Sequence, residues 1–300
     1  MIVAVASGKG GTGKTTVAVS LALSLAADAG VVPLFLDCDV EEPNAALFLR
    51  PAIQERREVG QMIPEVDLDK CTCCGRCAEV CQYHAVAVVG KKVLVFPELC
   101  HGCGSCTLNC PAGAIREILD VMGTIERGWA GGVEFAQGTM NVGEAMAVPI
   151  IRQLKRWAVP PPPAPPIGEG GGRPIILDAP PGTACPVVET MRGADLVLMV
   201  TEPTPFGLHD LRLAVEVARS ELGLPVGVVI NREGVGDRGV DGFCAAESIP
   251  ILMRIPLDRR IAEAYSDGVS LVEALPTYGK SFQQLYKQIG WLAEKNECCL

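Results

Sequence analysis

The chain has 300 residues, of which 49% are apolar and 20% charged, and its formal net charge is −9. So acidic a chain is unsuited to bulk electrostatic binding of nucleic acid, and no apolar run approaches the roughly 18 residues that span a bilayer. Fourteen cysteines, in a chain without an evident signal peptide, favour metal ligation in a reducing cytoplasm over secretion. We therefore expect a cytoplasmic protein with no nucleic-acid partner and no stable membrane anchor.

The chain opens with an apolar run of strand formers, followed at once by a glycine-rich segment. From Gly8 to Thr15 it matches Gly-x-x-x-x-Gly-Lys-Thr, the Walker A pattern, and a helix is expected over 15–29. The backbone N–H groups and the helix N-terminus would bind phosphate, with Lys14 reaching the β- and γ-phosphates and Thr15 ligating magnesium. A glycine turn without a ligand is the disfavoured alternative. The nucleotide-binding residues predicted here are Gly8, Lys9, Gly10, Gly11, Thr12, Gly13, Lys14, Thr15 and Thr16.

Five apolar runs are expected to form a sheet. They are continuous rather than alternating in polarity, which is typical of parallel strands buried on both faces. A helix is expected between Gly207 and Leu222, where apolar residues recur at helical spacing. The runs cover residues 2–6, 32–36, 175–177, 196–200 and 226–230. The fold class predicted from them is α/β, with a mainly parallel sheet flanked by helices.

Polar residues follow three of these runs. The second leads into Asp37-Cys-Asp39, the third into Asp178-Ala-Pro-Pro-Gly, and the fifth into Asn231-Arg232. An aspartate after an apolar strand is often only a helix N-cap. A carboxylate delivered to a magnesium water shell and followed by a Pro-Pro-Gly turn also suits a sensor of the γ-phosphate.

Cysteines between residues 71 and 110 repeat one spacing twice, with a period of 29 residues. This spacing resembles that of the two-cluster bacterial ferredoxins, in which the fourth cysteine of each motif ligates the other cluster. The resemblance implies two [4Fe–4S] clusters. One would be held by Cys71, Cys74, Cys77 and Cys110, and the other by Cys100, Cys103, Cys106 and Cys81.

Two features depart from the ferredoxin pattern. Gln82 replaces the proline expected after the first motif, and Cys73 is an extra thiol that could compete with Cys71 or Cys74 for iron. A disulfide framework and a pair of zinc sites use similar short spacings and are the alternatives. The matched offsets of two four-cysteine motifs disfavour both.

The cysteine segment divides the chain. Residues 67–119 have ferredoxin length and are predicted to form an inserted small α+β domain. Residues 1–66 and 120–300 would together form one discontinuous P-loop domain. A hairpin is expected between Gly123 and Gly143, leading back to the sheet. The Pro- and Gly-rich stretch 159–174 is interpreted as a stiff surface loop, with a partner-docking polyproline segment as the alternative.

Lys9, early in the glycine loop, makes the chain resemble the deviant Walker A ATPases, the class of MinD, ParA, Mrp and the nitrogenase iron protein. The resemblance implies that Lys9 contacts phosphate across a nucleotide-sandwich homodimer. It also implies that Asp39 orients or activates the attacking water, which makes Lys9, Lys14 and Asp39 the catalytic candidates. Asp37 and Asp178 would hold the magnesium shell with Thr15, and Asn231 and Arg232 would lie against adenine.

Two features near the C-terminal half extend this resemblance. Cys185 lies seven residues after Asp178, the offset at which the nitrogenase iron protein carries a cluster ligand, so it is a candidate redox or interface thiol. A small buried apolar cysteine is the alternative. A helix is expected over 281–296, in the position of MinD-type membrane anchors. The positive charges of its lysines are balanced by glutamates, which favours packing on the sheet over membrane binding.

Together the motifs resemble those of MinD-superfamily ATPases that carry an inserted ferredoxin domain. The resemblance implies a slow or partner-stimulated ATPase that hydrolyses ATP to ADP and phosphate with Mg²⁺, as an ATP-dependent homodimer or a heterodimer with a related ATPase. Nucleotide switching would gate electron transfer to an unidentified redox partner protein. An Mrp-like iron–sulfur carrier is the alternative, weakened because no cysteine pair outside the insert has Cys-x-x-Cys spacing. A third function, spatial positioning on a membrane or on DNA, would need a basic surface, which the sequence does not offer.

Overall fold

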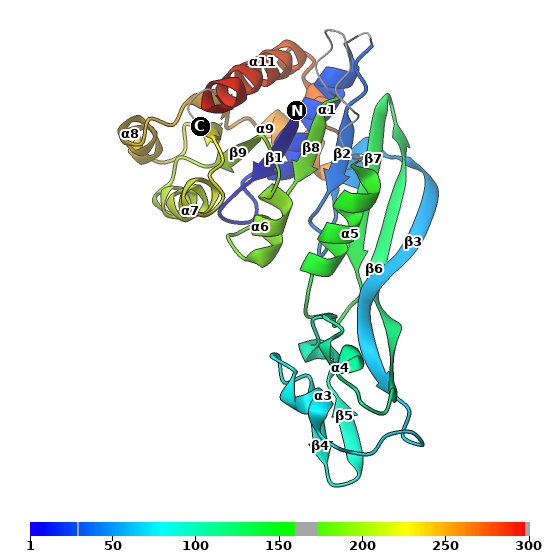
Figure 1. Ribbon diagram of the computed structural model, residues 1–300. Helices are drawn as coiled ribbons and strands as arrows, with labels where there is room; N and C mark the ends of the chain where they lie inside the picture. Colours follow the sequence, from blue (N-terminus) through cyan, green and yellow to red (C-terminus); the bar gives the residue numbers. More distant parts are fainter. Residues whose placement is uncertain (29, 160–172, 298–300) are drawn as a thin grey trace.

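The computed structural model describes residues 1–28, 30–159 and 173–297. An α/β body and a smaller lobe are joined by a long two-stranded ribbon (Figure 1). Within the described residues, one sheet has the strand order β11-β10-β9-β1-β8-β2-β7-β6-β3. Its strands are β1 (Ile2–Ala6), β2 (Leu34–Asp37), β3 (Ala52–Val66), β6 (Ile115–Ala130), β7 (Val133–Met140), β8 (Ile175–Asp178), β9 (Leu196–Thr201), β10 (Val226–Glu233) and β11 (Ile251–Pro256).

The sheet is parallel from β11 to β7 and antiparallel at the β7-β6-β3 edge. Each of the five predicted runs is a strand, with the second beginning two residues later than expected. β11 was not predicted. The predicted hairpin is formed by β6 and β7, which turn at Gly131 and Gly132, both with positive φ.

Alternate residues of the central strands face two separate hydrophobic cores. Ala4 and Leu36 belong to the core beneath α5 (Val148–Ala158), α6 (Cys185–Met191), α7 (Pro205–Glu216) and α8 (Gly239–Ala246). Val3 and Phe35 belong to the core beneath α1 (Lys14–Ala26) and α11 (Tyr278–Glu297). The central strands are therefore buried on both faces, which explains the continuous apolar runs of the sequence.

The predicted helices are present with shifted ends. The first predicted helix ends at Ala26, and the predicted 207–222 helix is α7 followed by a π-helical turn, Val217–Glu221. Phe282, Leu285 and Ile289 of α11 are buried in the core shared with α1, so this helix packs on the body. Most of the predicted Pro-rich loop lies outside the described residues. None of the described helices is both long and apolar enough to cross a membrane.

The ribbon of β3 and β6 was not predicted, because the N-terminal half of β3 is highly polar. Gln54 to Glu58 are five consecutive polar or charged residues, and most of them are exposed. β6 runs without a break from Ile115 to Ala130 and pairs with β3 along its length. It therefore crosses the domain boundary expected at residue 119, and that boundary stays a prediction.

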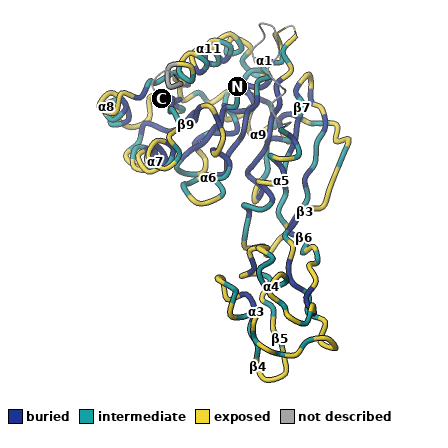
Figure 2. The backbone as a smooth tube through the Cα atoms, viewed as in Figure 1, coloured by how far each residue is buried: buried dark blue, intermediate teal, exposed yellow. Residues whose placement is uncertain are grey.

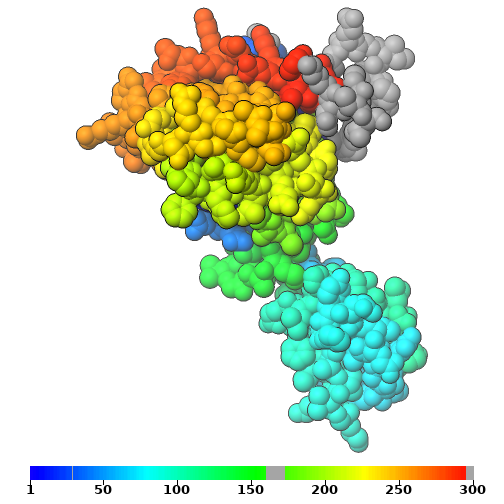
Figure 3. Space-filling model, turned by 90° about the vertical axis from the view of Figure 1, so that its left-hand side faces the viewer, coloured from blue at the N-terminus to red at the C-terminus, as the bar shows by residue number. Residues whose placement is uncertain are grey.

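The lobe beyond the ribbon holds the repeated cysteines. It contains the hairpin of β4 (Val86–Val89) and β5 (Lys92–Val95), and the short helices α3 (Arg76–Glu79) and α4 (Ser105–Leu108). Figure 2 shows that buried backbone is concentrated in the body and that the lobe is largely intermediate or exposed. Figure 3 shows the lobe standing clear of the body. Two small apolar clusters, each including cysteines, form its interior.

Candidate functional site

The glycine loop between β1 and α1 is closely packed on two sides. A Cβ added at Gly8 would lie 2.2 Å from the Asp210 backbone oxygen, and one at Gly13 would lie 2.2 Å from Asn231 Nδ2. Gly13 also has φ of 90° and no side-chain cap, so the first N–H groups of α1 have no side-chain acceptor at this helix end. A helix N-terminus of this kind is a ready site for an anion.

Buried charges meet at the ends of β1, β2 and β8. Asp37 and Asp178 are register partners on neighbouring parallel strands. Lys14 Nζ lies 2.8 Å from Asp178 Oδ1 and 4.0 Å from Asp39 Oδ2. The Lys14 and Asp178 side chains are 7% and 0% exposed, so this is a buried ion pair. Asp178 Oδ2 is buried without a hydrogen-bond partner in the described part of the chain.

The burial of these groups shifts their pKa values. Burial, together with the charge of Asp178, raises the pKa of Asp37 to about 7. Burial also raises the pKa of Asp39 to about 6, against the opposing effect of Lys14. Burial acts to lower the pKa of Lys14, but the charges of Asp178, Asp39 and Asp37 hold it above its ordinary value. The cluster thus carries excess negative charge that a cation would neutralise.

Asp37 accepts three backbone hydrogen bonds from the segment that follows β2. Its Oδ1 accepts a hydrogen bond from the Asp39 N–H at 3.2 Å, and its Oδ2 accepts from the N–H groups of Asn44 and Ala45 at 3.1 and 3.0 Å. Asp37 therefore anchors the segment that carries Asp39 to the start of α2 (Ala45–Leu49). Its expected place in the magnesium shell stays a prediction.

A cavity opens beside this cluster and extends to the end of β11. Asp39, Asn231 and Arg232 line it with much of the glycine loop. The wall of the cavity opposite the glycine loop was not predicted from the sequence, because β11 was not recognised and α9 (Arg259–Ser266) carries no nucleotide motif. That wall comprises Pro256, Leu257, Asp258, Ile261, Ala262, Tyr265 and Ser266.

Asn231 and Lys9 already have protein partners. Asn231 Nδ2 donates to the Thr12 carbonyl at 2.7 Å, and its Oδ1 accepts from the Arg232 N–H at 2.9 Å. The adenine contact expected of Asn231 stays a prediction, and its structural task is to join β10 to the glycine loop. Lys9 Nζ lies 3.3 Å from Oε2 of Glu202, a residue that sequence analysis did not single out.

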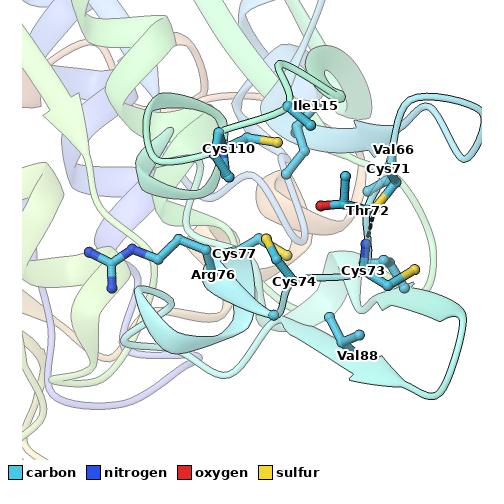
Figure 4. Close-up of a pocket in the computed structure, with 14 residues that line it drawn as sticks. Val66, Cys71, Thr72, Cys73, Cys74, Arg76, Cys77, Val88, Cys110 and Ile115 are labelled. Atoms are coloured by element: carbon cyan, nitrogen blue, oxygen red, sulfur yellow. Dashed lines mark hydrogen bonds between the residues drawn. The ribbon is translucent and has the colours of Figure 1, made fainter.

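The cysteines of the lobe lie around two cavities, and each cavity takes members from both motifs. Cys110 joins the first-motif cysteines at one cavity, and Cys81 joins the second-motif cysteines at the other. The first is lined by Cys71, Cys73, Cys74, Cys77 and Cys110 (Figure 4), and the second by Cys81, Cys100, Cys103 and Cys106. Apart from Cys73, these are the two sets that the resemblance to two-cluster ferredoxins implies. Their ligand role stays a prediction.

Backbone hydrogen bonds to sulfur repeat with the 29-residue period. The N–H of Cys73 donates to Cys71 Sγ and that of Gly102 to Cys100 Sγ, both at 3.4 Å. Likewise the N–H groups of residues 85 and 114 donate to the sulfurs of residues 81 and 110, at 3.2 and 3.3 Å. Hydrogen bonds to ligating sulfurs are one of the factors that tune an iron–sulfur cluster.

Cys73 differs from the other cysteines of its cavity. Its φ is 55°, a left-handed conformation, and the equivalent position in the second motif is Gly102, with φ of 60°. Figure 4 shows the Cys73 sulfur pointing away from those of Cys74, Cys77 and Cys110. The backbone N–H of Cys73 donates to Cys71 Sγ, while its thiol is turned away from those three sulfurs.

Among the described residues, the thiols are neither joined as disulfides nor gathered with other side chains around a single ion. Every cysteine in the described part of the chain is a free thiol. Among the same residues, no three His, Cys, Asp or Glu side chains converge as ligands of a single metal ion. The four thiols of each set stand around a hollow with an apolar lining, including Val66, Val88 and Ile115 at the first cavity. Such an arrangement fits a multi-iron cluster better than one ion.

The remaining thiols differ in exposure. Cys185 is exposed at the first turn of α6, so the buried alternative for this residue is wrong. Its redox or interface role stays a prediction. Cys38 and Cys244 are buried, and burial raises the pKa of Cys38 to about 12. We assign these two to the core.

A parallel sheet with a glycine loop before α1 and carboxylates at neighbouring strand ends defines a P-loop nucleotide-binding domain. The sequence model of the CobQ/CobB/MinD/ParA nucleotide binding domain matches residues 3–272, and the chain belongs to that family. Its relatives include two uncharacterized proteins of Methanocaldococcus jannaschii. MJ0579 is 31% identical over 91% of this chain and 92% of its own length, and MJ0578 is 30% identical over 96% of each.

A shorter match and two solved structures complete the comparison. The cytosolic Fe-S cluster assembly factor NUBP2 homolog of Trichoplax adhaerens is 30% identical over 33% of this chain and 44% of its own length. The cell division ATPase MinD of Pyrococcus furiosus superposes with a TM-score of 0.54, 22% identity and coverage of 97% and 98% of the two chains. MinD of Pyrococcus horikoshii, complexed with Mg-ADP, gives 0.56, 19% identity and 98% coverage of both. These structures share the fold of the chain.

Proposed function

We propose that this protein binds and hydrolyses ATP and couples nucleotide-dependent dimer switching to electron transfer through two [4Fe–4S] clusters. The observation that carries the proposal is the sorting of eight cysteines into two crossed sets of four, in a chain with a P-loop site. When bound, such clusters accept and donate single electrons. The inserted lobe would then be a ferredoxin-like redox module.

At the nucleotide site, different residues of the chain would bind the phosphates, the magnesium ion and the attacking water. The glycine loop and the start of α1 would hold the phosphates, and Lys14 would exchange Asp178 for the β- and γ-phosphates. Magnesium fits beside Thr15 and the unpartnered Oδ2 of Asp178, where a buried carboxylate oxygen lacks a hydrogen bond. Asp39, which lines the cavity, would orient the attacking water.

At the cysteine sites, the lobe would supply thiolate ligands and an apolar lining that excludes water. Cys71, Cys74, Cys77 and Cys110 would hold one cluster, and Cys81, Cys100, Cys103 and Cys106 the other. The repeated N–H···S hydrogen bonds would stabilise the negative charge of the sulfurs. Tyr83 and His101 line the second cavity and stack with ring centroids 3.7 Å apart.

Contacts between helices and the ribbon supply a physical link between the two sites. α6 begins soon after Asp178, and α5 binds it through Arg152, which pairs with Glu189 at 3.0 Å. From the next position of α5, Gln153 Nε2 donates to the Gly60 carbonyl of β3 at 2.7 Å. The next residue, Gln61, donates through Nε2 to the Cys100 carbonyl. A shift of α6 would therefore be transmitted to a cluster-binding loop.

The proposal is tested by titrating the cluster reduction potential in the ADP state and in a non-hydrolysable ATP state. An allosteric coupling of about 1–3 kcal/mol corresponds to a difference of roughly 40–130 mV for a one-electron couple. Reciprocally, reduction should change the affinity for nucleotide by the same factor. We expect Gln153→Leu, which removes the α5–β3 hydrogen bond, to reduce the difference. Titrations that superimpose in both nucleotide states would contradict coupling.

ATP-dependent dimerisation is a second prediction, for a homodimer or for a heterodimer with a related ATPase. Lys9→Ala removes a charge-assisted contact to phosphate worth about 1.5–3 kcal/mol. A homodimer loses two such contacts, so we expect it to be weakened roughly 10²- to 10⁴-fold, and a heterodimer that loses one to be weakened roughly 10- to 150-fold. ADP affinity should be unchanged, as measured by sedimentation and calorimetry. Lys280→Ala, at an exposed position on α11, is the control. A native chain that remains monomeric with ATP and with candidate partner ATPases would overturn the dimer.

An iron–sulfur carrier is a second candidate function, favoured by the partial similarity to the NUBP2 homolog. A carrier binds its cluster weakly and passes the whole cluster to an acceptor protein. Incubation of loaded protein with an apo-ferredoxin distinguishes the two functions. Transfer of iron to the acceptor supports the carrier. Iron that stays with the chain, together with electron transfer from the reduced chain to a separate cluster-loaded ferredoxin, supports the redox function.

A further inference from the structure

Glu202 lies between two cations of the nucleotide site. Its Oε2 is 3.3 Å from Lys9 Nζ, and its Oε1 accepts a hydrogen bond from Arg232 Nη1. The carboxylate thus gives one oxygen to each cation. The Glu202 side chain is 11% exposed, whereas those of Lys9 and Arg232 are 33% and 50% exposed. The anion is fixed inside the protein and the cations are nearer to solvent.

The backbone around Glu202 is held firmly in place. Thr201 Oγ1 donates to the Gly207 carbonyl at 3.1 Å, and Thr204 caps α7 by accepting from the Gly207 N–H at 3.0 Å. The Asp237 N–H donates to the Pro203 carbonyl at 3.0 Å. Glu202 is therefore a fixed acceptor toward which the flexible Lys9 side chain is drawn.

Arg232 lowers the cost of releasing Lys9. A carboxylate left without a cation in a largely buried position is strongly destabilising. Arg232 is bound to the other oxygen. Its backbone has a φ of 55°, and its N–H donates a hydrogen bond to Asn231 Oδ1. If Lys9 leaves, Glu202 keeps one partner. The geometry allows Lys9 to move while the rest of the site stays in place.

We propose that Glu202 is a positioning residue that holds Lys9 within its own subunit until ATP in a second subunit competes for it. This inference rests on the proposed contact of Lys9 with phosphate across the dimer. The exchange replaces a carboxylate–ammonium pair by a phosphate–ammonium pair, and Arg232 continues to compensate Glu202. The carboxylate would thereby set the ATP concentration at which the dimer forms.

Glu202→Gln tests the inference, because it removes the charge and keeps the shape and an acceptor for Arg232. We expect half-maximal dimerisation at an ATP concentration lower by roughly two- to fivefold, the range for a partly exposed ion pair. The acylation rate of Lys9 in nucleotide-free protein, followed by peptide mass spectrometry, should rise. Glu202→Asp keeps the charge and should return the labelling rate toward that of the native chain. Glu216→Gln, at an exposed position on α7, is the matched control.

The outcomes separate this inference from the proposed function. If Lys9→Ala dimerises like the native chain, the cross-dimer role of Lys9 is wrong. If Lys9→Ala blocks dimerisation but Glu202→Gln changes neither Lys9 labelling nor the ATP requirement, the positioning role of Glu202 is wrong. A Glu202→Gln chain that melts normally but binds ADP more weakly would overturn it too, because Glu202 would then serve nucleotide binding itself.

Discussion

Replacing Cys103 with serine is expected to remove about half of the iron from anaerobically purified protein, from roughly eight atoms per chain to about four. Cys103 lines the second cavity with Cys81, Cys100 and Cys106. A serine hydroxyl is a poor ligand compared with a thiolate, so the second cluster should be lost while the first is retained. Iron analysis and the paramagnetic signal after reduction measure the change, and nucleotide affinity should stay close to that of the native chain.

Cys73→Ser is the matched control for this experiment. Both cysteines lie within the repeated motifs, but the Cys73 sulfur points away from those of Cys74, Cys77 and Cys110. We expect the serine variant to keep all of its iron, because the contribution of residue 73 is its backbone N–H to Cys71 Sγ. Purified native protein that holds zinc, and shows no paramagnetic signal after reduction, would contradict the cluster assignment.

Replacing Lys14 with methionine is expected to abolish nucleotide binding and to destabilise the nucleotide-free protein. The substitution leaves the fully buried Asp178 without its cation, and breaking a buried pair costs about 3–5 kcal/mol. Urea unfolding measures the loss. Adding Asp178→Asn should recover much of the stability, because it removes the uncompensated charge, but it should not recover nucleotide binding. Lys9→Met, at a partly exposed ion pair, should cost no more than about 1 kcal/mol.

The destabilisation of Lys14→Met should depend on pH. Burial raises the pKa of Asp37 to about 7 and that of Asp39 to about 6 in the native protein, and removal of Lys14 takes away a cation that opposes both shifts. A raised carboxyl pKa means that the folded state binds protons more tightly than the unfolded state does. The stability contributed by those protons is present at low pH and is lost as pH rises through the folded pKa. The variant should therefore be less destabilised at pH 6 than at pH 8, and a loss independent of pH would contradict this explanation.

Local sequence patterns were sufficient to predict the glycine loop and the five apolar strands, and the resemblance of the cysteine spacing to that of ferredoxins implied the two cysteine sets. Each depends on residues close together in the chain, or on the 29-residue repeat that places equivalent residues in equivalent turns. The apolar strands were recognisable because burial on both faces excludes polar residues from them. The P-loop class and the family follow from these short-range patterns, and the family match agrees with them.

Only the tertiary structure revealed the β3–β6 ribbon and the partners of the charged residues. The N-terminal half of β3 is exposed and therefore polar, so no alternation of apolar and polar residues marked it as a strand. Glu202 meets Lys9 across more than 190 residues of sequence, and Gln61 reaches the Cys100 carbonyl across 39. The direction of the Cys73 sulfur depends on a left-handed φ that the residue type disfavours. Sequence determined which chemical groups the chain carries, and long-range packing decided which of them meet, because contacts between distant segments leave no local pattern.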